Sequence, residues 1–159
     1  MVMEHGGAGA AHDADRDLDA IVVPSTAKFG GGALLLLGAL TLVLCLQTVL
    51  VVRRYDAVTI PIIGVMFALG LGDAVLGFQI TRGSGKAAVI GTVLAGVTFL
   101  GSGSWFVFGL FHNFVSVLAL LLLPIAVAAG LFSALSISWA RRADAARDRL
   151  RAQGLDPGL

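Results

Sequence analysis

The chain has 159 residues, of which 57% are hydrophobic and 13% are Asp, Glu, Lys or Arg. Soluble domains carry about 25% charged residues, so this composition excludes an ordinary soluble domain and predicts an integral membrane protein with one helical domain. The formal net charge of +1 gives no reason to expect a nucleic-acid partner. Cys45 is the only cysteine, which excludes an internal disulfide and a thiolate metal site.

Residues 1–28 are predicted to form an acidic, disordered tail on the cytoplasmic side. Gly6–Ala11 has low complexity. The acids of the tail outnumber its bases, with Glu4, Asp13, Asp15, Asp17 and Asp19 against Arg16 and Lys28. Such a segment has too little apolar surface to fold alone. Its acidic character also differs from the basic start of a signal peptide.

Four long apolar runs follow the tail. They are Ala33–Val52, Val58–Ile80, Ala87–Phe111 and Phe114–Ala140. Each reaches the roughly 20 residues needed to cross a hydrocarbon core about 30 Å thick. A chain in lipid must also satisfy its own backbone hydrogen bonds, which favours helices. We therefore expect an all-α bundle over residues 29–140, with transmembrane helices near 29–52, 58–80, 87–111 and 114–140.

Short connections between these runs predict the topology. Arg53–Ala57, Thr81–Lys86 and His112–Asn113 leave little room between consecutive runs, so the four helices should be antiparallel neighbours in an up-down-up-down bundle. Both termini then share a face with the second connection. Of the 11 Lys and Arg residues, all but Arg53 and Arg54 belong to that face, which predicts cytoplasmic N- and C-termini.

Residues 141–159 are expected to extend the fourth helix as a basic cytoplasmic segment. Asp144 and Asp148 each precede an arginine by three residues, at Arg147 and Arg151. On a helix such pairs contribute about 0.2–0.5 kcal/mol each. The segment is typical of a basic anchor that contacts anionic lipid, and a docking site for a cytoplasmic partner is the alternative.

Asp73 is the only acid inside the four apolar runs. It lies about 10 Å from the predicted inner interface, where an ionised acid costs about 2.5–3.5 kcal/mol. Counting inward from that interface along the other three helices places five residues at the depth of Asp73, namely Gly38, Thr41, Thr92, Ser133 and Ser136. Two interpretations stay open. The acid is either a protonated side chain that holds the helix register through these hydroxyls, or a proton or cation site.

A second polar level is predicted nearer the outer face. Its members are Gln47, Ser102, Ser104, His112 and Asn113. They would line an outer vestibule, or they would make ordinary interhelical hydrogen bonds worth about 0.6 kcal/mol each.

Small residues recur every fourth position in three of the predicted helices. The second helix has Gly64, Ala68 and Gly72, the fourth has Ala126, Gly130, Ala134 and Ser138, and the third has Ala88, Thr92 and Gly96. Such faces let helix backbones approach closely in lipid. They are predicted to serve packing within the bundle, or packing against a neighbouring subunit.

These features favour a non-catalytic membrane subunit that packs through its small-residue faces into a homo-oligomer or a larger inner-membrane complex. The abundance of Arg, Ala, Gly and Leu is typical of GC-rich bacterial genomes, so the bacterial cytoplasmic membrane is the predicted location. No catalytic set, metal site or cofactor motif is predicted. The alternative is a small channel or a proton- or cation-coupled transporter that uses Asp73. The expected partners are the lipid bilayer and other membrane subunits.

Overall fold

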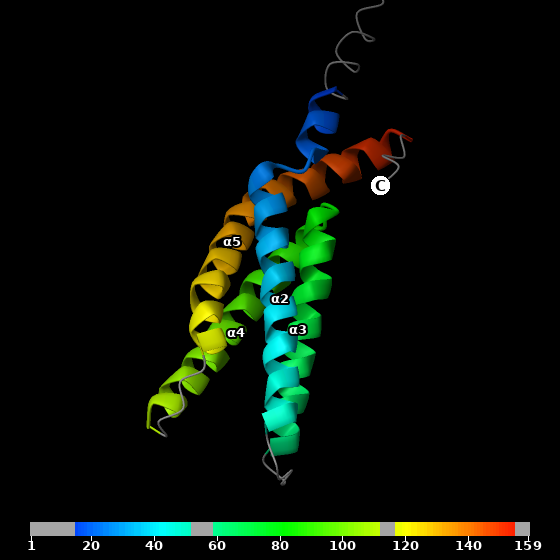
Figure 1. Cartoon of the computed structure of the whole chain (residues 1–159). Helices are drawn as coiled ribbons and strands as arrows, with labels where there is room; N and C mark the ends of the chain where they lie inside the picture. The colour runs from blue at the N-terminus through cyan, green and yellow to red at the C-terminus, as the bar shows by residue number, and fades with distance from the viewer. Residues whose placement is uncertain (1–14, 52–58, 112–116, 155–159) are drawn as a thin grey trace, which may run out of the picture.

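The structure is a computed structural model, and it describes residues 15–51, 59–111 and 117–154. These residues form four long helices, and they contain no strand (Figure 1). The helices are α2 (Ser25–Val51), α3 (Thr59–Thr81), α4 (Gly85–Phe111) and α5 (Val117–Ala152). Each of the four is long and apolar enough to cross a membrane. The predicted all-helical character and the four apolar helices are therefore confirmed for the described part of the chain.

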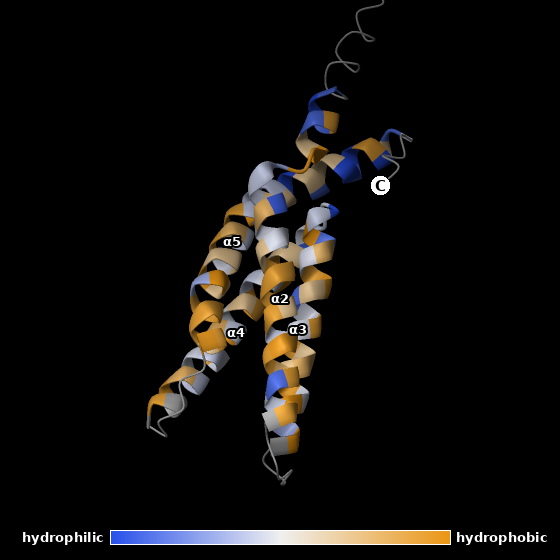
Figure 2. Ribbon diagram, viewed as in Figure 1, coloured by the Kyte–Doolittle hydropathy of each residue, from blue (hydrophilic) through white to orange (hydrophobic). Residues whose placement is uncertain are grey.

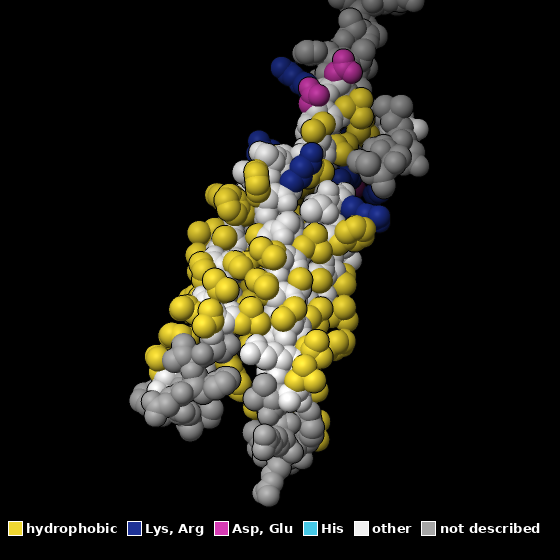
Figure 3. Space-filling model, in the orientation of Figure 1, with side chains coloured by type: hydrophobic (Ala, Val, Ile, Leu, Met, Phe, Trp, Pro, Cys, Tyr) yellow, Lys and Arg dark blue, Asp and Glu magenta, His cyan; other side chains and the backbone are white. Residues whose placement is uncertain are grey.

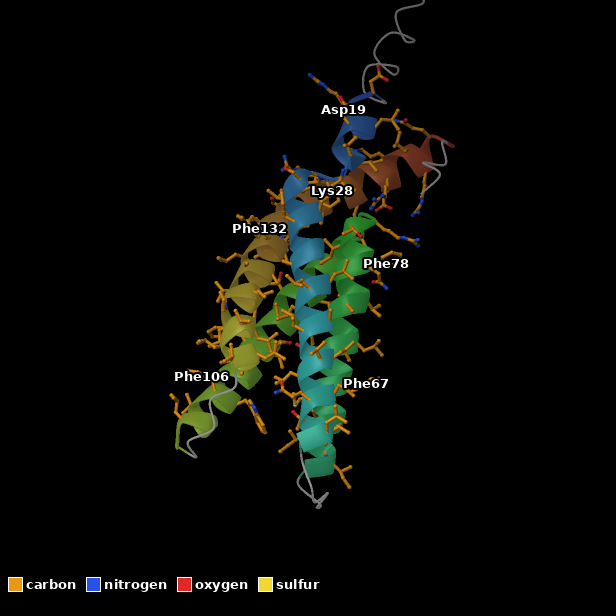
Figure 4. The ribbon with its side chains drawn as sticks, viewed as in Figure 1. Asp19, Lys28, Phe67, Phe78, Phe106 and Phe132 are labelled. Carbon is orange, nitrogen blue, oxygen red and sulfur yellow. The ribbon has the colours of Figure 1, made fainter. Side chains whose placement is uncertain are left out.

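The described side chains are distributed unevenly by polarity. Apolar residues cover the four helices along most of their length, and charged residues gather at the end where α5 turns across the bundle (Figures 2 and 3). Many of the apolar side chains are exposed; Phe67 and Phe78 of α3, for example, point outward with 54% and 48% of their surface accessible (Figure 4). An apolar surface this extensive is typical of a protein that meets lipid or another subunit.

Residues 15–28, which the sequence assigns to a disordered tail, are largely helical in the structure. Residues 15–21 form a short helical segment, and α2 already begins at Ser25. Ile21 is buried against Ala146 and Leu150 near the end of α5. The sequence argument treated the segment as one that had to fold alone, whereas in the structure α5 supplies an apolar surface for it. Residues 1–14 lie outside the described part.

Polar contacts hold the same segment in place. Asp17 pairs with Arg149 of α5 at 2.9 Å. The indole Nε1 of Trp139 donates a hydrogen bond to the carbonyl oxygen of Ala20 at 3.1 Å. The segment 15–21 is thus joined to the part of α5 that the sequence predicted to extend beyond the bundle.

Glycine backbones make the closest helix contact, between α2 and α3. A Cβ built on Gly38 would lie 2.5 Å from the carbonyl oxygen of Gly70, and one built on Gly31 would lie 2.7 Å from that of Gly77. Both glycine pairs are spaced by seven residues along their helices. A seven-residue spacing keeps one face of a helix against its neighbour over two turns. The two backbones therefore touch, and no larger residue fits between them.

The connection between α3 and α4 is a tight turn with a defined cap at each end. The N–H of Gly83 donates to the carbonyl oxygen of Ile80 at 2.9 Å, and that of Ser84 donates to Gln79 at 3.0 Å. This Schellman arrangement requires a left-handed residue, and Gly83 has φ of 89°. The Oγ of Ser84 then accepts a hydrogen bond from the N–H of Ala87 at 3.3 Å and caps α4.

The pairs α2–α3 and α4–α5 diverge with distance from segment 15–21 (Figure 1). Buried side chains from all four helices form the core, among them Leu34, Leu37, Ile80, Ala88, Ala95, Leu122 and Ala129. Small alanines dominate on α4 and α5, while α2 contributes leucines. The divergence leaves room between α3 and α4, and the candidate site lies beside it.

Candidate functional site

Asp73 is held inside the bundle by a threonine of the next helix. Its side chain is fully buried, and the Oγ1 of Thr98 donates a hydrogen bond to its Oδ2 at 2.8 Å. The other oxygen, Oδ1, is buried and has no hydrogen-bond partner among the described residues. A buried polar atom without a partner costs about 1–3 kcal/mol. Asp73 therefore has one satisfied and one unsatisfied carboxyl oxygen within the described residues.

Thr98 was missed by the depth count, which favoured Thr92. The Oγ1 of Thr92 donates to the carbonyl oxygen of Ala88, one turn back on its own helix, at 2.9 Å. Thr98 lies six residues farther along α4, or about 9 Å. The count assumed upright helices, but α4 diverges from α3, which shifts the residues that meet. A repeat of small and hydroxyl residues at three- and four-residue spacing would have shown the inner face of α4, since Ala88, Gly91, Ala95, Thr98 and Ser102 are all buried.

The two serines of α5 lie elsewhere. Ser133 lies against Gly30 of α2, since its backbone N would be 3.0 Å from a Cβ built on Gly30. Ala74, the neighbour of Asp73, lies against Gly38 of the same helix. Gly30 and Gly38 are eight residues apart, or about 12 Å along α2. Ser133 Oγ is buried without a hydrogen-bond partner in the described part of the chain, so it does not serve Asp73.

The remaining predicted hydroxyls at this depth bond within their own helices. Ser136 donates to the carbonyl oxygen of Phe132 at 2.7 Å, and Thr41 donates to that of Leu37 at 2.8 Å. The hydrogen bond to Asp73 comes instead from Thr98.

A cavity of about 290 Å³ opens between α3 and α4, next to the Asp73–Thr98 pair. Most of its wall is apolar, built from Leu44, Pro61, Val65, Met66, Leu69 and Leu122, and it also includes Thr41, Thr98, Ser102 and Trp105. Thr98 thus lines the cavity and also binds Asp73. Asp73 itself does not line it, so the cavity suits an apolar guest.

The described members of the predicted outer polar level are divided between the interior and the surface. Ser102 is buried and lines the cavity, while Gln47 and Ser104 are exposed. His112 and Asn113 lie outside the described residues. What the structure brings together is Ser102 with Thr41 and Thr98 along the cavity wall.

The small-residue stripe of α3 runs from the interior onto the surface. Gly72 faces Leu94 of α4, but Ala68 and Gly64 are exposed. No atom of the described residues lies within 4 Å of a Cβ built on Gly64. The change follows from helix geometry, because a step of four residues turns about 40° past a full circle.

The stripes of α5 and α4 behave in the same way. On α5, Ala126 is buried and Gly130 half-buried, while Ala134 and Ser138 are exposed. On α4, Ala88 is buried, Thr92 is half-buried and Gly96 is exposed. A Cβ on Gly96 would likewise meet no described atom within 4 Å. Parts of each stripe thus remain uncovered by this chain.

Comparison with known proteins found no match among protein-family models, curated proteins or solved structures. Within the described residues, no group of three or more His, Cys, Asp or Glu side chains is placed to hold a metal ion.

Proposed function

We propose that the chain is a non-catalytic integral membrane subunit that joins a second copy of itself, or another membrane protein, through exposed small residues of α3 and α4. The observation that carries this proposal is the uncovered small-residue surface at Gly64, Ala68 and Gly96. Close backbone approach at small residues drives helix association in lipid.

Several features support an up-down-up-down bundle in a bacterial cytoplasmic membrane. Gly31 meets Gly77 while Gly38 meets Gly70, so residue numbers rise along α2 as they fall along α3, as in antiparallel neighbours. Basic side chains gather at the end that includes the α3–α4 turn and the end of α5. An excess of Lys and Arg on one face favours its cytoplasmic location.

In this proposal Asp73 fixes the register of α3 against α4. Its bond to Thr98 is a polar side-chain contact between the two helices, and the pair lies beside the cavity. Hydrogen bonds of this kind contribute about 0.6 kcal/mol each in membrane bundles, enough to favour one packing over another without any transport chemistry.

The experiment is native mass measurement of the purified 16.3 kDa chain in mild detergent and in lipid nanodiscs. We expect an oligomer or a co-purified subunit, and Gly64→Leu with Ala68→Leu should reduce that association by filling the small surface. The matched control is Gly32→Leu with Ala39→Leu, since these residues are also small and exposed but lie on α2. A wild-type chain that is monomeric and alone in both media would refute the proposal.

A channel or a proton- or cation-coupled transporter is the second candidate, and the unpartnered Oδ1 of Asp73 favours it. A relay needs an acid that can exchange its proton, and Thr98 connects this acid to the cavity wall. Reconstituted wild-type protein would then carry a proton or cation flux that Asp73→Asn abolishes while the oligomeric state is unchanged. The subunit proposal predicts no flux from either protein.

A further inference from the structure

A second cavity, of about 460 Å³, lies between the α3–α4 turn and the end of α5. The turn contributes Arg82, Gly83, Ser84, Gly85 and Lys86, and α5 contributes Asp144, Arg147, Asp148 and Arg151. Four basic side chains thus face two acidic ones. We call this the turn pocket.

The ion pairs of the turn pocket leave a positive excess. Arg147 is committed to the fold, since it pairs with Asp144 at 3.1 Å, donates to the carbonyl oxygen of Gly83 at 3.1 Å and has a side chain only 15% exposed. Arg151 approaches Asp148 only to 3.9 Å, and both are exposed. Arg82 and Lys86 are exposed, and no described carboxylate forms an ion pair with either. These two cations are therefore free for an outside anion.

The backbone of the turn also fits a negative group. The first N–H groups of a helix have no partner within it, and α4 starts in this pocket at Gly85. A Cβ on Gly85 would lie 2.7 Å from Oδ2 of Asp144. The carboxylate of Asp144 therefore lies beside the start of α4, in the same pocket as the cations.

The surroundings of Arg82 and Lys86 point to a lipid. The guanidinium of Arg82 lies over the ring of Phe78, 4.2 Å from its centre, and Phe78 is half-exposed. Val89 and Ile90, next to Lys86 on α4, are exposed as well. The cations thus sit where the charged end of the molecule meets its apolar surface (Figure 3). A phospholipid presents the same order, with its phosphate above its acyl chains.

We propose that the turn pocket binds the phosphate of an anionic phospholipid through Arg82 and Lys86, with the acyl chains along Phe78, Val89 and Ile90. Basic pockets between helices at the cytoplasmic face recognise such headgroups, and charge-assisted hydrogen bonds from Arg to phosphate are strong. The site is distinct from the subunit surface on α3 and α4, and either can exist without the other.

The test is native mass spectrometry of the full chain in neutral detergent with phosphatidylglycerol or phosphatidylcholine. We expect the wild-type chain to retain phosphatidylglycerol, and Arg82→Gln with Lys86→Gln to weaken that retention about tenfold. The matched control, Lys28→Gln with Arg141→Gln, removes the same two residue types outside the pocket and should retain the lipid. Equal loss in both double variants would overturn the proposal, because it would show only general attraction to charge.

Two further arms complete the test. Arg82→Lys with Lys86→Arg keeps both charges and should keep binding; loss of binding in this variant, if it melts at the wild-type temperature, would contradict a charge-based site. Inorganic phosphate and glycerol phosphate are tested for thermal stabilisation of the same preparations. Stabilisation by these soluble anions equal to that by phosphatidylglycerol would replace the lipid with a soluble phosphate ligand and overturn the proposal.

Discussion

The hydroxyl of Thr98 donates a 2.8 Å hydrogen bond to the carboxyl of Asp73 across the interface between α4 and α3. Both side chains are almost fully buried, and the second carboxyl oxygen has no partner in the described residues. The bond is therefore the polar connection at a point where the two helices begin to diverge.

Thr98→Val should destabilise the bundle by about 1–3 kcal/mol, because it removes the donor and leaves both oxygens of Asp73 unpaired in a dry interior. The matched control is Thr92→Val, since Thr92 bonds only to Ala88 of its own helix; it should change stability by less than about 1 kcal/mol. Unfolding in mixed micelles with increasing denaturing detergent measures both. Equal effects of the two variants would show that the bond to Asp73 contributes no more to stability than a hydrogen bond within one helix.

Gly38→Ala should loosen the α2–α3 contact. The added methyl group would lie 2.5 Å from the carbonyl oxygen of Gly70, so the backbones must separate, at a cost of about 1–3 kcal/mol. Gly32→Ala on the same helix is the control, since no described atom lies within 4 Å of its Cβ; the better helix propensity of Ala should stabilise it by up to about 1 kcal/mol. In the same unfolding assay, the change in unfolding free energy should have opposite signs for the two variants. No change in Gly38→Ala would mean that the contact is looser than described.

Leu150→Ala should release the segment 15–21 from α5. Leu150 is fully buried against Ile21, and removal of such a side chain costs about 2–5 kcal/mol where the site cannot collapse. Hydrogen exchange of the amides in residues 15–21 should accelerate. Leu18→Ala, at a residue that is 52% exposed in that segment, should leave the exchange nearly unchanged. Arg149→Gln should also have a small effect, because its ion pair with Asp17 is partly exposed and worth about 0–1 kcal/mol.

Arg147→Gln should free the end of α5 from the α3–α4 turn. Arg147 joins Asp144 and the carbonyl oxygen of Gly83, and both partners lose a charged donor in the variant; we expect a cost of about 1–3 kcal/mol. Limited proteolysis of the end of α5 should become faster. Arg142→Gln is the control, since Arg142 is exposed and bonds only to Ser138 of its own helix. Identical cleavage of both variants would argue against a structural role for Arg147.

The helices themselves could be predicted from hydropathy. The runs placed α3 at 58–80 and α4 at 87–111, and the structure has Thr59–Thr81 and Gly85–Phe111. The fourth helix was expected from residue 114, and α5 begins at Val117 after residues that are not described. Apolar length is a direct physical requirement of a membrane span, so it is visible in the sequence.

The contacts between helices were harder to predict, because a helix that is apolar all round does not show which face turns inward. The stripe at Gly64, Ala68 and Gly72 has a regular spacing, yet the backbone contact of α3 uses Gly70 and Gly77. Regular spacing predicts that one helix face carries only small side chains, but it does not predict which helix packs against that face. Thr98 was missed for a related reason: its depth relative to Asp73 depends on how far α4 diverges, which depends on the packing of all four helices.

The docking of residues 15–21 on the end of α5 has a consequence for biosynthesis. Ile21 packs against Ala146 and Leu150, so the segment 15–21 has no surface to bind until the ribosome has synthesised these two residues of α5. The close glycine contact of α2 with α3 needs only the first half of the sequence. Assembly is therefore expected to proceed in two stages, with an α2–α3 hairpin that forms early in synthesis and a later closure, at the charged end, that requires α5.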